Sequence, residues 1–130
     1  MKLLVDTHTF LWLMESPERL SGRASDECSD PTNSLYLSAA SLWEIQIKSQ
    51  LGKLDLGMPL SDIVKAEVTN GPFGFLPIRA DHVVAVGDLP TYHSDPFDRM
   101  LIAQARSENM EFVTADGMIQ QYASLVRIVW

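Results

Sequence analysis

The chain has 130 residues, of which 46% are hydrophobic and 21% charged, and its formal net charge at pH 7 is −7. The length fits one domain over residues 1–130, and the ordinary share of apolar residues excludes a disordered chain. The acidic balance argues against a broad basic surface for nucleic acid. It leaves an RNA substrate open, because divalent cations bound to a group of acids would offset part of the negative charge.

No segment of the sequence indicates export or a membrane. The chain starts Met-Lys-Leu-Leu-Val-Asp, without the basic segment, apolar stretch and cleavage site of a signal peptide. Its apolar runs are far shorter than the roughly 20 residues of a membrane-spanning helix. The single cysteine, Cys28, has no partner for an internal disulfide. We therefore expect a cytoplasmic protein with no membrane contact.

Short apolar runs alternate with segments of helical periodicity in the first half of the chain. We expect strands at 2–5 and 35–37, helices at 7–14, 21–29 and 39–50, and a turn at 30–33. Ser38 is placed to cap the helix over 39–50, and Gly52 is placed to end it in a left-handed conformation. The residues of this helix expected to face the core are Leu42, Ile45 and Leu51.

The second half continues this alternation. We expect helices at 61–68, 80–86, 96–107 and 117–122, a turn at 71–74, and strands at 75–78, 111–114 and 126–129. Asp95 followed by Pro96 is a helix start, since Pro suits the first helical position and Asp accepts free amides of the first turn. The order β-α-α-β-α-α-β-α-α-β-α-β predicts an α/β sandwich with helices on both faces of the sheet.

Four acids lie where a strand is expected to pass into a helix, or in the early turns of that helix: Asp6, Glu44, Asp98 and Asp116. Turns that follow parallel strands open at one edge of the sheet, so these carboxylates are expected to meet in one crevice. Crowded carboxylates favour a divalent cation, because burying them together without one raises their pKa values and destabilises the fold. Mg²⁺ suits such oxygen ligands, and Mn²⁺ accepts the same set.

Each acid also has a purely structural explanation. Asp6, Asp98 and Asp116 are placed to satisfy amides at helix starts. Glu44 lies four residues before Lys48, which is the spacing of a helical ion pair. Lys48 and Arg99 are expected either to contact phosphate or to pair with the acids. Capping alone does not explain why all four acids fall at the same edge of the sheet.

Other kinds of catalytic site have little support. His8, His82 and His93 have no Cys or His partner at zinc-ligand spacing, so we expect them around the site or at the surface. Cys28 follows two acidic residues, which disfavours a thiolate nucleophile. No Gly-rich phosphate loop occurs.

These residues give the chain a resemblance to PIN-domain ribonucleases, specifically the VapC-type toxins of bacterial toxin–antitoxin pairs. Four stretches carry it: Leu3-Leu4-Val5-Asp6-Thr7-His8, then Ser38-Ala39-Ala40-Ser41-Leu42-Trp43-Glu44-Ile45 continuing through Lys48 to Leu51-Gly52-Lys53-Leu54, then His93-Ser94-Asp95-Pro96-Phe97-Asp98-Arg99-Met100-Leu101-Ile102-Ala103-Gln104-Ala105, and the shorter Val113-Thr114-Ala115-Asp116. The resemblance covers nearly the whole chain in matching order.

The resemblance implies a three-layer α/β/α domain with a mainly parallel central sheet and the activity of a Mg²⁺-dependent endoribonuclease, in which metal-activated water attacks RNA phosphate. It implies that Asp6 and Asp98 are primary metal ligands, that Glu44 holds the metal or its water, and that Asp116 binds a second ion or orients a ligand. Thr7 is expected to bond the Asp6 carboxylate or a metal-bound water, unless it is an ordinary helix-start hydroxyl.

The resemblance also implies a homodimer and a small VapB-like antitoxin whose carboxy-terminal segment lies over the active-site groove. The run from Phe10 to Met14 has more apolar surface than one core-facing helix stripe requires, so part of it is available to an amphipathic partner helix. Ordinary burial of Trp12 is the alternative explanation.

Two other functions are compatible with parts of this sequence. A phosphatase with Asp6 as covalent nucleophile, as in haloacid-dehalogenase-like enzymes, needs a second acid two residues later, where this chain has His8. A catalytically inactive PIN-like module that binds RNA or a partner is the other alternative, since fold does not fix function. The complete set of four acids argues against it.

Overall fold

The structure, a computed structural model, describes residues 1–130 and contains one five-stranded sheet in which all neighbouring strands are parallel, in the order β3-β2-β1-β4-β5. The strands are β1 (Lys2–Val5), β2 (Ser34–Ser38), β3 (Phe73–Leu76), β4 (Glu111–Val113) and β5 (Ile128–Val129). The α-helices are α1 (Thr7–Glu15), α2 (Gly22–Ser29), α3 (Ala39–Gln50), α4 (Leu60–Asn70), α5 (Ala80–Val86) and α6 (Pro96–Ser107), and the 3₁₀ helices are η1 (Pro17–Arg19) and η2 (Gly117–Tyr122). None of the helices has the length and apolar composition needed to cross a membrane.

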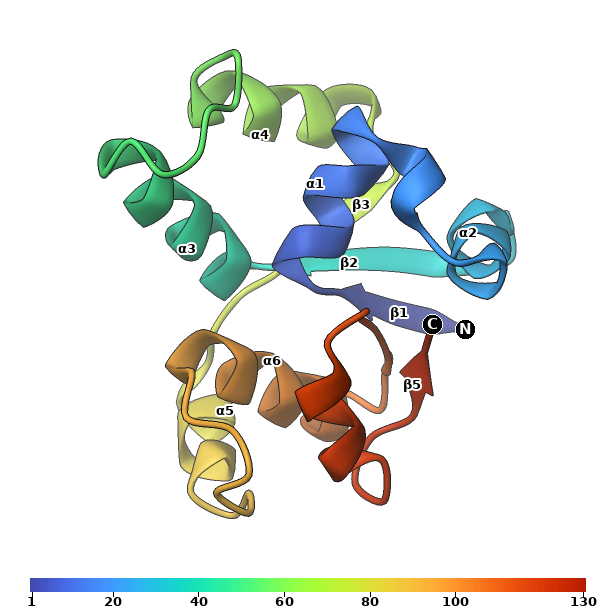
Figure 1. The fold of residues 1–130 in the computed structure, drawn as a ribbon, viewed down its shortest axis with the longest axis vertical. Coiled ribbons are helices and arrows are strands. Elements are labelled where there is room, and N and C mark those ends of the chain that lie inside the picture. The colour runs from blue at the N-terminus through green and yellow to red at the C-terminus, as the bar shows by residue number, and fades with distance from the viewer.

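Helices cover both faces of the sheet, which confirms the predicted α/β sandwich. Figure 1 shows α1, α3 and α4 on one side of β1 and β2, and α5 and α6 on the other. Leu3 and Val5 of β1 belong to a buried cluster with Phe10 of α1, whereas Leu4 belongs to a second buried cluster with Leu101 of α6. A strand buried on both faces is a continuous apolar run, which is why Lys2–Val5 was recognisable in the sequence.

Most element boundaries follow their sequence signals. Helix α6 starts at Pro96, and the Asp95 side chain accepts the amides of Phe97 and Asp98, as expected. The Ser38 hydroxyl accepts the Ala40 amide at the start of α3, and Gly52 has a φ of +71° just after its end. These caps satisfy backbone groups that have no partner within the helix.

Some boundaries and burial predictions were wrong. Strand β3 covers Phe73–Leu76 instead of 75–78, so half of the predicted turn is strand. The Phe73 ring packs edge-on against Phe10 with centroids 5.1 Å apart, and Pro77 has no amide to extend the ladder. Leu51, expected in the core, is 63% exposed because α3 ends one residue before it.

The sheet register sets the position of the site. Val5 of the central strand pairs with Leu37 of β2 and with Val113 of β4. Each of these three residues is followed by a polar residue, namely Asp6, Ser38 and Thr114. The three polar residues therefore leave the sheet side by side at its carboxyl edge, where ligands of parallel sheets bind.

Candidate metal centre

Asp6 connects β1 to α1 and is 6% exposed. Its Oδ1 accepts the Thr9 amide at 2.8 Å, so Asp6 caps α1, and its Oδ2 accepts the hydroxyl of Thr114. None of the ion pairs in the structure includes Asp6. Neutral donors thus hold the Asp6 carboxylate in place, and it has no lysine, arginine or histidine as an ion-pair partner.

Glu44 on α3 is also 6% exposed and is held by Thr7 and Lys48. The Thr7 hydroxyl lies 2.7 Å from Glu44 Oε1 and 3.0 Å from Ser41 Oγ, and since it has one proton, it donates to Glu44 and accepts from Ser41. Lys48 Nζ lies 2.9 Å from Glu44 Oε2, which confirms the expected helical ion pair. The predicted bond from Thr7 to Asp6 was wrong, because Thr114 occupies that position.

Asp98 and Asp116 meet at a histidine. His93 Nε2 lies 2.9 Å from Asp98 Oδ2 and 3.4 Å from Asp116 Oδ2. Burial, together with the negative charges of Asp95, Glu44 and Asp6, raises the pKa of Asp98 to about 6, and His93 opposes the shift. The Asp98 carboxyl therefore lies within electrostatic reach of acids from β1 and α3.

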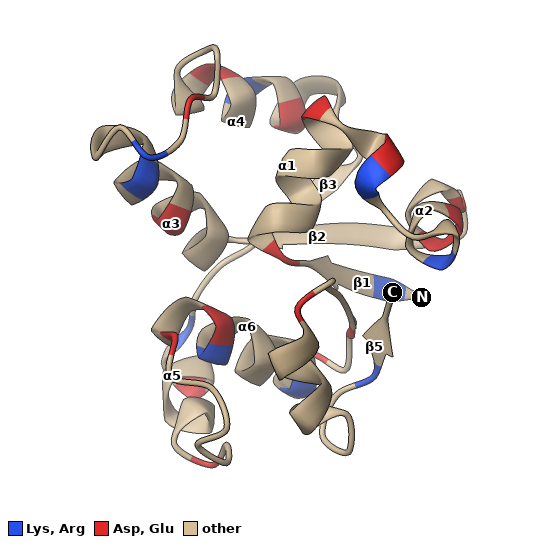
Figure 2. Cartoon of the chain, viewed as in Figure 1, with Lys and Arg blue, Asp and Glu red and all other residues tan.

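The Thr114 hydroxyl connects Asp6 to Asp116. Thr114 Oγ1 donates to Asp6 Oδ2 and accepts the Asp116 amide at 3.1 Å, while the Asp116 carboxylate accepts the Met118 amide and caps η2. Figure 2 shows acidic segments after β1, on α3, at the start of α6 and before η2 around the middle of the molecule. The structure thus brings together all four acids that the sequence singled out.

Arg99 is not directed at the acids. Its guanidinium donates to the carbonyls of Val86, Pro90 and His93, at 3.2, 2.9 and 3.3 Å. Of the two alternatives for Arg99, pairing with the acids is thus wrong, and contact with phosphate stays a prediction. Arg99 instead holds the loop between α5 and α6, and this loop carries His93.

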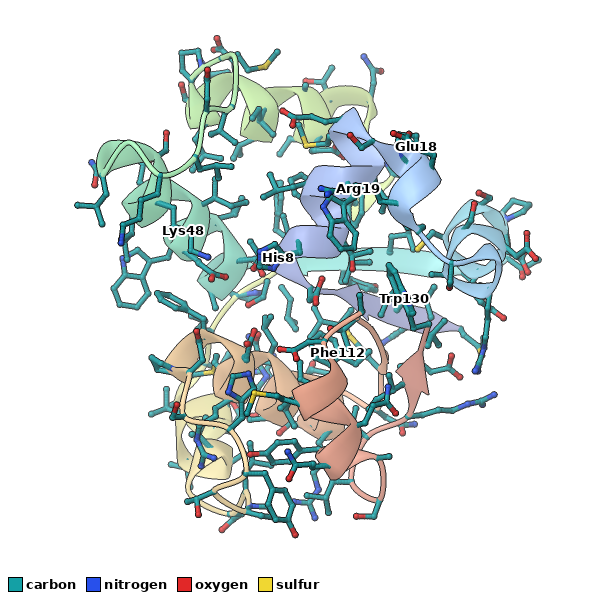
Figure 3. All side chains as sticks on the ribbon, viewed as in Figure 1. His8, Glu18, Arg19, Lys48, Phe112 and Trp130 are labelled. Atoms are coloured by element: carbon teal, nitrogen blue, oxygen red, sulfur yellow. The ribbon has the colours of Figure 1, made fainter.

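The histidines differ in location. His8 is exposed, close to the end of β1 (Figure 3), as expected for a surface residue. His82 is fully buried beside Glu108, so its predicted place around the site or at the surface was wrong. His93 lies around the site, as expected, although its position five residues before Asp98 was its only further signal in the sequence. Thr114 was not singled out from the sequence, because its role depends on the pairing of β4 with β1.

A hollow of about 290 Å³ adjoins the acids and is lined by Asp6, His8, Trp12, Ala115 and Asp116. Two larger hollows contain none of the four acids. The hollow of about 290 Å³ is therefore the only one lined by any of the four acids.

The donor set fits a hard divalent cation. The four acids supply carboxylate oxygens, and Lys48 is the one lysine or arginine that pairs with any of them. Mg²⁺ and Mn²⁺ prefer such ligands, whereas structural zinc sites use sulfur and nitrogen. A cation bound beside Asp98 would relieve the repulsion that contributes to its raised pKa.

A family model described as the PIN domain matches residues 3–125. This chain belongs to the PIN domain family. This PIN domain is 24% identical over 131 residues to Ribonuclease VapC22 of Mycobacterium tuberculosis, covering 92% of this chain and 91% of the relative. The resemblance seen in the sequence is thereby confirmed.

Solved structures share the fold of this PIN domain. VapBC2 of Rickettsia felis, bound to a DNA fragment from its promoter, matches with a TM-score of 0.72 and 14% identity over the whole of both chains. The sarcin–ricin loop cleaving toxin VapC20 of Mycobacterium tuberculosis matches with a TM-score of 0.66 and 18% identity, over 95% of this chain and 96% of the other. These likenesses confirm the predicted α/β/α architecture.

Proposed function

We propose that this PIN domain is a divalent-metal-dependent endoribonuclease that acts as the toxin of a toxin–antitoxin pair. The observation that carries the proposal is the grouping of Asp6, Glu44, Asp98 and Asp116 around one edge of the sheet, where Lys48 is the one lysine or arginine that pairs with any of them. The relatives support it, because one is named a ribonuclease and another a loop-cleaving toxin.

Asp6 and Asp98 are the proposed primary ligands of Mg²⁺, with Glu44 as a further ligand or the holder of a water, and Asp116 as the ligand of a second ion or an orienting group. Such ions supply activation of water and stabilisation of the leaving oxygen. The protein fixes its ligands in advance: Thr114 and the Thr9 amide hold Asp6, and Thr7 holds Glu44. Pre-positioned ligands reduce the ordering required when the ion binds.

Lys48 is the proposed phosphate contact from the protein itself. Its side chain is 39% exposed and already lies at Glu44, on α3 (Figure 3). With a net charge of −7, the chain has few cations for the RNA backbone, so bound metal has to supply most of the attraction for phosphate. RNA affinity is therefore expected to depend strongly on the divalent ion.

A second copy of the chain is the proposed homodimer partner. Trp43, next to Glu44, is 60% exposed and packs edge-on against Phe97 with ring centroids 5.4 Å apart. Together with Ala40, Ile78, Pro96 and Met100 these rings line an apolar hollow of about 220 Å³. Exposed apolar surface of this kind is typical of association sites.

A VapB-like antitoxin is the proposed inhibitor, and the cytoplasm the proposed location. Several solved relatives are toxin–antitoxin complexes. In this chain, the Trp12 and Trp130 ring centroids lie 5.9 Å apart, and Arg19 Cζ lies 5.1 Å from the Trp12 ring centroid. The chain itself therefore covers much of the Trp12 ring, which favours ordinary burial of Trp12 over contact with a partner helix. Met14 is 40% exposed, and the hollow beside Asp6 remains open to an inhibitory segment.

The test is cleavage of structured and unstructured RNA by the purified chain, with Mg²⁺ or EDTA, beside Asp98→Asn and the control Asp81→Asn outside the site. We expect cleavage by the wild type and the control, and none with EDTA or in Asp98→Asn. Cleavage that persists in Asp98→Asn contradicts the proposal. A wild type that binds Mg²⁺ and cuts no RNA supports the binding module instead.

A further inference from the structure

The His93 side chain lies between two acids of the site and is 11% exposed. Its Nε2 is 2.9 Å from Asp98 Oδ2 and 3.4 Å from Asp116 Oδ2, so one nitrogen contacts carboxylates from two different elements. No other lysine, arginine or histidine nitrogen forms an ion pair with either acid. The imidazole is the direct connection between Asp98 and Asp116.

The tautomer of His93 follows from its other nitrogen. Nδ1 accepts the backbone amide of Asp95 at 3.3 Å. A ring nitrogen that accepts a hydrogen bond has no proton, so a neutral imidazole in this position has its proton on Nε2. A histidine that binds metal through Nε2 usually donates a proton from its other nitrogen, and the Asp95 amide prevents this. His93 is thus arranged as a hydrogen-bond donor to the carboxylates and not as a metal ligand.

The Nε2 donor is buried and aligned with neither carboxylate. A buried N–H without an aligned acceptor costs free energy, so a native protein is expected to supply it with a partner. Both candidate acceptors are within reach, since a small rotation of Asp98 or Asp116 turns an oxygen toward the N–H. A carboxylate that held an ion with one oxygen would have its second oxygen free to accept from His93.

The loop that carries His93 is held from several directions. The His93 amide donates to the Tyr122 hydroxyl at 2.9 Å, and this hydroxyl donates to the Pro90 carbonyl at 2.8 Å. Arg99 donates to the His93 carbonyl as well as to Pro90. Tyr122 is fully buried. The imidazole is therefore fixed in place before any ligand binds.

We propose that His93 is a positioning residue of the metal centre, whose Nε2–H donates to the outer oxygen of Asp98, the nearer acceptor, or to that of Asp116, so that the other oxygen of that carboxylate faces the ion. The inference rests on the proposed function. It assigns a role to a histidine outside the four acids, and it explains why Arg99 and Tyr122 hold the loop. Residues that orient metal ligands from behind typically contribute about 10–100-fold to metal affinity.

The test measures the affinity for Mn²⁺ alone, without RNA, by electron paramagnetic resonance of the free ion. His93→Gln keeps an amide N–H near the position of Nε2, whereas His93→Asn has one only near Nδ1. We expect His93→Asn to weaken Mn²⁺ binding about 10–100-fold and His93→Gln to restore most of it. Exposed His8→Asn is the control and should bind like the wild type.

Wild-type affinity in His93→Asn overturns the inference, as does an equal loss in both His93 variants with unchanged melting temperatures. If His93→Asn does not fold, Tyr122→Phe gives the second readout, since it removes a hydroxyl that holds the loop, and wild-type affinity there counts against the proposal. Failure of the wild type to bind Mn²⁺ refutes the proposed metal centre itself. Loss of the His93 effect alone, in a wild type that binds Mn²⁺ and cuts RNA, leaves the proposed function intact.

Discussion

Two groups of acids and histidine in this fold look alike in geometry and differ in electrostatics. In the site, His93 meets Asp98 and Asp116, and on the α5 side of the sheet His82 meets Asp81 and Glu108. In each group the potential ligand atoms lie within 4.8 Å of one another. Both histidines accept a backbone amide at Nδ1. Ligand geometry alone therefore does not separate the two groups.

Arg79 makes the difference. Its guanidinium bonds Asp81 at 3.0 Å and Glu108 at 2.7 Å, and these bonds lower the pKa of both carboxyls. Asp98 has no such partner, and its pKa is raised by burial and by neighbouring acids. Arg99 is adjacent in sequence, but its donors go to loop carbonyls. Arg79 makes the group of Asp81, His82 and Glu108 a structural ion-pair network. The group of His93, Asp98 and Asp116 has no arginine partner, so its carboxylates are available to a metal ion.

The largest expected effect is on metal affinity. Asp98→Asn removes a proposed ligand and should weaken Mn²⁺ binding by roughly 100-fold or more, beyond the usual range for residues behind the ligands. Glu108→Gln, the matched change in the arginine-bonded group, should leave the affinity unchanged. Isothermal titration calorimetry of both variants decides this, and equal losses would remove the distinction between the two groups.

The raised pKa of Asp98 predicts an unusual pH dependence of stability without metal. Its folded pKa of about 6 exceeds the ordinary value of 3.8, so between these values the folded chain binds more protons than the unfolded chain. The contribution of Asp98 to the free energy of unfolding is therefore fully present below about pH 4 and is lost as pH rises through about 6. The loss amounts to at most about 3 kcal/mol of unfolding free energy. Urea unfolding in EDTA should show Asp98→Asn more stable than the wild type at pH 7, with the difference vanishing near pH 4. A wild type that is more stable at pH 7 contradicts the raised pKa.

The arginine-bonded group of Asp81, His82 and Glu108 lies next to the buried side chain of Gln104. Gln104 is fully buried, accepts the Ser38 hydroxyl and donates to the Pro77 carbonyl, and its amide lies 3.3 Å from His82 Nδ1. Gln104→Leu should cost about 1–3 kcal/mol of unfolding free energy, because buried polar groups lose their partner. Mn²⁺ affinity, measured on the same samples, should remain near that of the wild type. Lost affinity at full stability would show that the two groups are coupled.

The smallest expected effect concerns the one lysine in the site. Lys48→Met removes a partly exposed ion pair with Glu44 and should change the unfolding free energy by about 0.2–0.5 kcal/mol. It should also tighten Mn²⁺ binding by less than about fivefold, since Glu44 Oε2 loses a competing cation. Weaker Mn²⁺ binding in this variant would mean that Lys48 orients Glu44 for the ion more than it competes with it.

Local signals made much of the fold predictable. Helices α3, α5 and α6 begin and end as expected, because caps such as Ser38, Asp95 and Gly52 act within a few residues. Strand β3 was displaced by two residues because its position depends on the partner strand β2 and on packing against Phe10. Neither contact is visible in a short segment of sequence.

The same division applies to the site. The four acids were predictable because each lies at a strand-to-helix junction or in the turns that follow, and the parallel sheet brings such junctions together. Their neighbours were not predictable, since Thr114 meets Asp6 only through the pairing of β4 with β1. His93 likewise reaches Asp98 and Asp116 through a loop held by Arg99 and Tyr122. These positions depend on contacts between strands and loops, which the spacing of residues in the sequence does not show.

The most direct measurement is the anomalous diffraction signal of Mn²⁺ in crystals of the wild-type chain. We predict a peak among the carboxylates of Asp6, Glu44, Asp98 and Asp116, and none at Asp81, His82 and Glu108, where Arg79 already supplies the positive charge. A peak at the arginine-bonded group, or no peak among the four acids at saturating Mn²⁺, would contradict the account.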